Sequence, residues 1–229
     1  MRDPAENDAL FLSPQARRER NREEMRRAIM NAARAVMREQ GVAALSLREV
    51  ARRVKLQAPS LYAYFPSKMA LYDALFLEGI RTYRTYRSQS VPHQGSFREM
   101  LGAWLEGYMR FAQKHPDLYQ LCFERPVPGF VPSAASMKES IDGLTQFEGE
   151  LAAMIAAGQV NPGLPTNQAR DLLIAMSHGL TSQHMANEPH LPVGTGRYGG
   201  LIPFAVALFE AAWAPEQRAN PDAGDATDQ

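Results

Sequence analysis

Apolar residues recur with the helical spacing i, i+3, i+4 along most of the chain. The first segment with this spacing covers residues 22–40 and is followed by Gly41, a typical helix stop. Further segments with helical spacing cover residues 67–87, 97–114, 116–123, 134–158, 166–187 and 200–214. No stretch shows the alternation of a β-strand. With two short helices between Ser46 and Phe65, the pattern predicts an all-α protein of about nine helices.

The stretch between residues 46 and 68 differs from the others because its apolar stripes are short. Ser46 and Glu49 have the spacing of a capping box, which predicts a helix start. A three-residue turn, residues 55–57, follows, and Pro59 then stands in the first turn of a helix of about nine residues. Two short helices joined by such a turn predict a helix-turn-helix.

The outer face of this helix pair carries side chains suited to DNA. Arg48, Arg52 and Arg53 are predicted to point outward, as are Tyr62 and Tyr64. A tyrosine offers a hydroxyl to a phosphate and a ring to a thymine methyl group. Lys68 follows Ser67, which should cap the next helix, so its ammonium and the helix N–H groups would form an anion site. A surface lysine without a function is the alternative.

The net charge of zero conceals two oppositely charged halves. Residues 1–87 hold 17 Lys and Arg against 10 Asp and Glu, and the remainder holds 8 against 15. This asymmetry favours an anionic partner at the front half, although arginines that only solvate helix faces would give the same count. Residues 1–21 are predicted to form a disordered basic arm, either on DNA or as a solubilising tail, and residues 215–229 a disordered tail.

Composition and spacing exclude several kinds of site. The single cysteine, Cys122, allows neither an internal disulfide nor a cysteine zinc site. His178, His184 and His190 lack the spacing of a helical metal site, and there is no carboxylate pair, nucleophile elbow or glycine-rich phosphate loop. We therefore expect no metal, no cofactor and no catalytic residue. Without an apolar run of about 20 residues or an apolar leader, a cytoplasmic protein is expected.

The stretch LSLREVARRVKLQAPSLYAYFPSKMALYDAL, residues 45–75, resembles the DNA-binding domain of TetR-type transcriptional regulators. Its most diagnostic part is the segment L-Y-x-Y-F-x-S-K, residues 61–68. The resemblance implies an all-helical homodimer with a three-helix head at 22–82 and a ligand-binding and dimerisation domain at 83–214. It also implies DNA contacts at the matching positions, which are Arg48, Gln57, Ala58, Pro59, Ser60, Tyr62, Tyr64 and Lys68.

The turn departs from the family pattern at two positions. Lys55 stands where the family usually has glycine, and a lysine at positive φ costs about 1 kcal/mol. We therefore expect either another turn shape or a phosphate contact from Lys55. Gln57 replaces the usual serine or threonine cap, so the following helix should be less well capped.

The rear half is similar to a TetR subgroup with a W-x-H-G segment, in which Met176 takes the place of the tryptophan before His178. This similarity implies that the helices at 166–187 and 200–214 form the dimer faces, and that the C-terminal domain binds a small apolar or amphipathic ligand. Plain core packing is the alternative for each of the candidate ligand residues, which are Trp104, Tyr108, Phe111, Phe123, Met137, Phe147, Met176 and His178.

The helix-turn-helix pattern and the resemblance to TetR-type regulators together imply a dimeric, ligand-responsive repressor that binds a near-palindromic operator and is released by a small molecule. Two alternatives remain open. A protein that compacts DNA without sequence preference would share the basic head, and a TetR-type activator would share the whole architecture.

Overall fold

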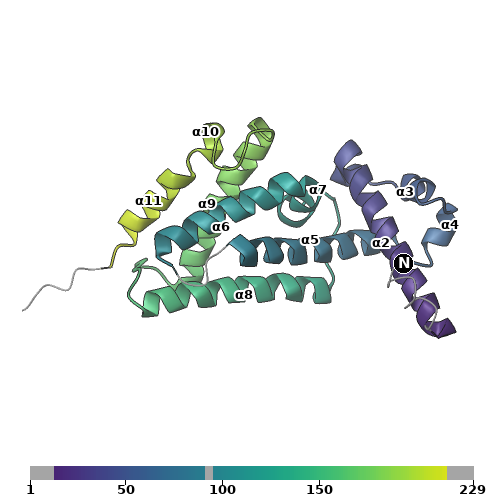
Figure 1. Cartoon of the computed structure of the whole chain (residues 1–229), viewed down its shortest axis with the longest axis horizontal. Coiled ribbons are helices and arrows are strands. Elements are labelled where there is room, and N and C mark those ends of the chain that lie inside the picture. The colour runs from purple at the N-terminus through teal and green to yellow at the C-terminus, as the bar shows by residue number, and fades with distance from the viewer. Residues whose placement is uncertain (1–12, 91–94, 216–229) are drawn as a thin grey trace, which may run out of the picture. The chain divides into compact units, whose positions relative to one another are not determined.

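A computed structural model describes residues 13–90 and 95–215, and within these ranges every regular element is helical (Figure 1). The all-α prediction is confirmed. The elements are α2 (Pro14–Gln40), η1 (Val42–Ala44), α3 (Leu47–Arg53), α4 (Ala58–Leu61), α5 (Lys68–Ser90), α6 (Phe97–Lys114), α7 (Pro116–Tyr119), the π-helical turn η2 (Gln120–Glu124), α8 (Ala134–Ala156), α9 (Thr166–Asn187), α10 (Gly196–Gly199) and α11 (Ile202–Ala212).

The chain divides into two units. Unit 1 takes in Met1–Arg84 and Phe111–Ile141, and unit 2 takes in Thr85–Arg110 and Asp142–Gln229. Neither unit is continuous in the sequence, since α7 and its neighbours group with the helix-turn-helix. The boundary expected at residue 82, between a DNA-binding and a ligand-binding domain, stays a prediction about function.

The core of the helix-turn-helix in unit 1 comes from the apolar stripes seen in the sequence. Side chains from α2, α3, the α4 region and α5 are buried there, among them Ile29, Val36, Val50, Leu61, Phe65, Leu71 and Leu75. The short helices α3 and α4 lie beside the long α2 (Figure 1), with α3 in contact with both. Apolar burial of this kind is the main force that holds such short helices.

The prediction of a disordered arm over residues 1–21 is wrong from Pro14 onward, because helix α2 already begins there. Ser13 Oγ accepts the Ala16 N–H at 3.2 Å, and Pro14 occupies the first turn, where a missing N–H is harmless. An ion pair between Arg20 and Glu24, 3.5 Å apart, follows one turn later. Local capping and pairing therefore sustain helix without an apolar stripe. Residues 1–12 and 216–229 lie outside the described ranges.

The second helix of the pair is shorter than its expected nine residues. The α-helical part ends at Leu61, and the N–H groups of Ala63 and Tyr64 bond three residues back, to Ser60 and Leu61. Among the described residues, no side-chain cap begins this helix at Gln57, as its sequence indicated. Pro66 disfavours helical geometry in the residue before it, so the chain tightens into turns before α5 begins behind its Ser67 cap.

Unit 2 has its own core, built from α6, α8, α9 and α11. Its buried side chains include Leu101, Trp104, Leu105, Met109, Leu151, Met154, Leu173, Val206, Phe209 and Trp213. The rings of Phe209 and Trp213 meet edge to face at 4.9 Å, and the Trp213 carbonyl accepts the Asn161 N–H at 2.8 Å. None of the described helices combines the length and apolarity that crossing a membrane requires.

Candidate nucleic-acid interface

The turn between α3 and α4 keeps the shape of a glycine turn although Lys55 occupies it. Lys55 has φ 57°, in the left-handed region. Its N–H bonds to the Arg52 carbonyl at 3.2 Å, and the N–H of Leu56 bonds to the Ala51 carbonyl at 2.9 Å. This pair of bonds defines a Schellman motif, in which glycine is the usual residue. The expectation of another turn shape is therefore wrong, and the turn carries about 1 kcal/mol of backbone strain.

An open hollow of about 530 Å³ lies in the angle between α3 and α4. It brings together three residues that the sequence assigned to DNA: Arg48, Gln57 and Ala58. Arg48 and Gln57 are exposed, and Ala58 is half-buried. Over residues 13–90 and 95–215, the Arg48 guanidinium forms no hydrogen bond or ion pair. Its five donors are thus available to a partner.

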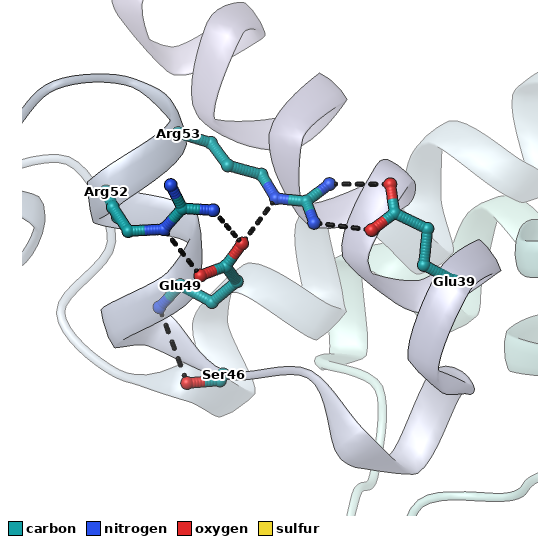
Figure 2. Close-up of polar contacts among 5 residues, drawn as sticks. All are labelled: Glu39, Ser46, Glu49, Arg52 and Arg53. Carbon is teal, nitrogen blue, oxygen red and sulfur yellow. Dashed lines mark hydrogen bonds and ion pairs between the residues drawn. The ribbon is translucent and has the colours of Figure 1, made fainter.

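The neighbouring arginines of α3 are held by carboxylates (Figure 2). Arg52 donates to both oxygens of Glu49, at 2.8 and 2.7 Å, and Arg53 bridges Glu49 and Glu39. Hydrogen bonds from Arg52 and then Arg53 lower the pKa of Glu49 to about 2. Glu49 also completes the helix start, since its N–H bonds to Ser46 Oγ at 3.4 Å. Arg53 is thus not the outward side chain expected, because its guanidinium turns back toward α2.

Two arginines of α2 hold the far end of the α4 segment, a role that sequence reasoning missed. Arg22 donates to the Ala63 carbonyl at 2.9 Å, and Arg26 donates to the Tyr64 carbonyl at 2.5 Å. Arg26 also lies 4.3 Å from the centre of the Phe65 ring. These contacts satisfy carbonyls that the short helix leaves open and fix its direction. The signal in the sequence is the four-residue spacing of Arg22 and Arg26, which places both on one face of α2 but does not identify their partners.

The other predicted DNA contacts lie at the surface of the same head. Pro59 and Ser60 are exposed, Tyr62 is 53% exposed, and Tyr64 is half-buried. Lys68 is more constrained, because its ammonium lies 3.4 Å from the Ala43 carbonyl and 5.5 Å from the centre of the Tyr72 ring. The DNA-contact role of these residues stays a prediction, which their exposure permits.

A buried ion cluster ties α2 to α7 and α5 within unit 1. The side chain of Asp117 is fully buried and accepts from Arg34 Nε at 2.7 Å and from Arg38 at 3.4 Å. Arg34 also donates to Glu78 at 2.7 Å and to His115 Nδ1 at 3.0 Å. Burial would lower the pKa of Arg34, but its bonds to Asp117 raise it. The two carboxylate partners, Asp117 and Glu78, hold the Arg34 side chain in the interior of unit 1.

The candidate ligand residues are distributed over both units. In unit 2, Trp104 meets Phe147 edge to face at 4.4 Å, Tyr108 Oη lies 3.1 Å from His178 Nδ1, and Met176 packs against the core. In unit 1, Phe111 and Phe123 are 6.2 Å apart and both contact the Tyr83 ring, whereas Met137 lines a separate cavity. These side chains therefore form several groups within the units, and their ligand role stays a prediction.

One polar atom in the unit 2 group stands out. Trp104 is 7% exposed, and in the part of the chain that the structure describes its Nε1–H donates to no acceptor. A buried donor without a partner costs about 1–3 kcal/mol. Arg87 lies 5.8 Å from the centre of the Trp104 ring and 4.9 Å from that of Phe147, and forms an ion pair with Glu150. The group thus combines apolar rings, an orphan donor and a cation.

Two family models match this chain. Residues 29–75 match the model of bacterial regulatory proteins of the tetR family. Residues 101–197 match the C-terminal domain model described as tetracyclin repressor-like. The first match covers most of the head and its helix-turn-helix, and the second covers α7 to α9 and most of α6.

Individual proteins show the same likeness. The chain is 27% identical to the HTH-type transcriptional activator FasR of Mycolicibacterium smegmatis over 150 residues, 61% of this chain and 68% of that protein. A Rhodococcus sp. RHA1 protein of unknown function has a TM-score of 0.69 at 21% identity, over 82% of this chain and 95% of that one. The regulator FadR of Bacillus subtilis, solved with stearoyl-CoA, has a TM-score of 0.63 at 16% identity, over 81% and 97%.

These structural neighbours share the fold, and the two models together cover the helix-turn-helix and the greater part of the C-terminal helices. Members of the matched family are DNA-binding transcription regulators and not enzymes. The chain belongs to the TetR family of bacterial transcription regulators.

Proposed function

We propose that this regulator binds a near-palindromic operator as a homodimer and that a small amphipathic ligand releases it, so that it acts as a repressor. The observation that carries the DNA part is the open face of the helix-turn-helix. Arg48 stands there beside Gln57 and Ala58 without a partner in the part of the chain that the structure describes, while carboxylates neutralise Arg52 and Arg53 next to it. An unpaired arginine at the hollow is suited to bidentate contact with guanine.

The outer faces of α9 and α11 support the homodimer. Both helices bury one side in the core of unit 2, yet Leu172 and Ala175 on α9 are exposed, and on α11 Phe204 is 72% and Leu208 59% exposed. Gly179 lies on the same exposed stripe of α9, and a Cβ there would meet nothing within 4 Å. An apolar stripe on two neighbouring helices is what an isologous four-helix interface buries.

Phe204→Glu tests this interface, because a carboxylate cannot be buried in it without a partner. We expect the variant to sediment as a monomer and to lose operator binding. Ile141→Glu is the matched control, since Ile141 on α8 is also exposed, at 52%, and should leave the dimer intact. A Phe204→Glu variant that stays dimeric at micromolar concentration places the interface elsewhere.

The proposal of a ligand rests on the group that Trp104, Phe147 and Arg87 form in unit 2. A ligand with an apolar chain and a carbonyl would cover the rings and accept from the Trp104 Nε1–H, removing the cost of that orphan donor. The stearoyl-CoA bound by FadR has this chemistry, and we extend it to this chain as a long-chain acyl thioester. Such a ligand releases DNA only if it binds the DNA-incompetent arrangement more tightly.

The experiment is an operator titration with and without stearoyl-CoA. DNA selected from a random pool supplies the operator, and random DNA at equal salt supplies the reference. We expect preference for an inverted repeat and weaker binding with the ligand. Trp104→Phe, which removes the donor, should weaken ligand binding about tenfold, and Trp213→Phe is the matched control. Equal affinity for random DNA would favour the compacting alternative.

Activation is a second candidate function, and the name of the relative FasR favours it. Whether the bound regulator activates or represses transcription depends on where the operator lies relative to the promoter. Transcription in vitro with purified RNA polymerase separates the two functions: a repressor lowers the transcript and the ligand restores it, whereas an activator raises it.

A further inference from the structure

Unit 1 contains a cavity that the proposed function leaves unused. Its volume is about 180 Å³, and it lies between α5, η2, the loop after η2 and α8. The lining side chains are Phe76, Leu121, Cys122, Arg125, Pro126, Val127, Phe130, Val131, Pro132, Met137 and Ser140. An engineered apolar cavity of about 150 Å³ holds benzene, so this cavity has room for a ring or a chain of about six carbons.

The cavity has an apolar lining with one cation, Arg125. Arg125 ends the π-helical turn η2 with φ 49°, a left-handed conformation that residues with a side chain rarely adopt. Among the described residues its guanidinium has no hydrogen bond or ion pair, and the residue is exposed. Single π-turns and left-handed residues without glycine gather at functional sites. A free guanidinium at an apolar cavity is suited to a carboxylate with an apolar tail.

We propose that this cavity binds an aliphatic carboxylate of about six carbons, with Arg125 pairing the carboxylate and the tail lying among Phe76, Val127 and Met137. The site goes beyond the proposed acyl thioester site, whose contacts are side chains of unit 2. Binding to the cavity can be measured without DNA, so its failure and the failure of the proposed function are separate results.

The cavity wall is connected to the DNA-binding head through two contacts. Phe130 lies with its ring 5.6 Å from that of Tyr72 and 6.3 Å from that of Phe76. The buried Tyr72 hydroxyl donates to the Val42 carbonyl at 2.6 Å, in the turn η1 that precedes α3. A ligand that displaces Phe130 would therefore shift Tyr72 and, through it, η1, the turn that sets the direction of α3. It alters DNA affinity to the extent that its own affinity differs between the two head arrangements.

The chain provides its own reporter for this cavity. Cys122 lines it and is the single cysteine in the sequence. Modification by methyl methanethiosulfonate, followed by mass spectrometry of the full chain, thus reports on this place alone. Burial raises the pKa of the thiol, so the reaction is slow and is followed over hours at pH 8. A ligand in the cavity should slow it in proportion to occupancy.

The probe is sodium hexanoate, with 1-hexanol as the uncharged partner of equal length. We expect saturable protection of Cys122 by hexanoate and at least tenfold weaker protection by hexanol. Arg125→Gln should reduce hexanoate affinity at least tenfold, and Lys114→Gln, which removes an exposed cation elsewhere in unit 1, should leave it unchanged. Isothermal titration of the full chain checks the same affinities without the thiol.

Arg125→Gly separates a ligand role from a structural one. Glycine relieves the left-handed backbone, so this variant should melt at a higher temperature and still lose hexanoate binding at least tenfold. A variant that melts higher and binds hexanoate as before overturns the proposal. So do equal protection by hexanoate and hexanol, an equal loss in Arg125→Gln and Lys114→Gln, and protection by hexanoyl-CoA with none by hexanoate.

Discussion

The Asp117 cluster and the hollow between α3 and α4 use the same residue type for opposite purposes. Arg34 has a side chain 13% exposed and is surrounded by Asp117, Glu78 and His115. Arg48 is exposed and unpaired within the described ranges. The first arginine links helices of unit 1, and the second is available to a partner, which is DNA in the proposed function. The placement of carboxylates, and not the arginine itself, decides which role an arginine takes.

Arg52 and Arg53 show how finely this placement works. They lie four and five residues after Arg48, yet Glu49 and Glu39 hold them. A count of arginines along α3 gives three cations, but two of them, Arg52 and Arg53, are paired with carboxylates. Within the described ranges, Arg48 is thus the one arginine of α3 without a carboxylate partner, which under the proposed function favours base readout over general attraction to phosphate.

The largest expected effect comes from breaking the buried cluster. Asp117→Ala leaves Arg34 partly buried without its main carboxylate, which should lower the free energy of unfolding by about 3 kcal/mol. Urea unfolding measures it. Arg38→Gln is the control: its side chain is 44% exposed and its contact is 3.4 Å long, so the loss should stay below about 1 kcal/mol. Equal losses in both variants would show that Asp117 is not the centre of the cluster.

Removing the free arginine should change binding and not stability. Arg48→Ala is expected to weaken operator binding by about 1–3 kcal/mol and to relax base preference at one position. Fluorescence anisotropy at fixed salt measures it, with urea unfolding alongside. Arg52→Ala, one turn away but paired, should change operator affinity much less. A uniform loss on all sequences would make Arg48 a phosphate contact.

The strained turn offers a finer comparison, since α8 ends in the same motif with glycine. Gly158 has φ 69°, and the N–H groups of Gly158 and Gln159 bond to the carbonyls of Ile155 and Met154. Lys55→Gly should raise the free energy of unfolding by about 1 kcal/mol, and Gly158→Lys should lower it similarly. If Lys55 contacts a phosphate, Lys55→Gly also reduces the salt slope of DNA binding by about 0.9. An unchanged slope would leave the lysine without a DNA role.

The smallest expected effect is a pH dependence from His115. Burial and then Arg34 lower its pKa from 6.5, so the folded state favours the neutral ring. Below pH 6.5 the unfolded chain binds the proton more readily, and stability falls as the pH drops. An arginine can only donate, so His115 Nδ1 must accept from Arg34. The charged groups that face His115 are Arg34, Arg38 and Asp117. His115→Gln should flatten the fall between pH 7.5 and 5.5 in urea unfolding; an unchanged fall assigns it to other groups.

Periodicity and capping predicted most of the fold because burial of an apolar stripe and satisfaction of helix ends are local demands. Ser46, Ser67 and Gly41 each end or begin a helix where expected. The start of α2 was missed because its first two turns carry no apolar stripe and depend on Ser13 and on ion pairs. The left-handed conformation of Lys55 was not predicted, because glycine is the residue that usually adopts it at the end of a helix.

Less of the site than of the fold could be predicted from the sequence, because residues that contact one another in the site can be far apart along the chain. The pairing of Arg52 and Arg53 with Glu49 follows from a spacing of three and four residues. Asp117 lies 83 residues from Arg34, and no local pattern connects them. The candidate ligand side chains likewise share helical spacing but fall into two units, because spacing reports the face of a helix and not what that face meets.

The exposed apolar stripe of α9 and α11 has a consequence for how much of this regulator a cell can keep. In the proposed dimer, association stabilises the folded chain by mass action, so stability rises with the concentration of the protein itself. Dilution below the dimer dissociation constant exposes Phe204 and Leu208 and favours the unfolded chain, which proteases remove. Abundance and persistence are thereby coupled, and a scarce regulator is also a short-lived one.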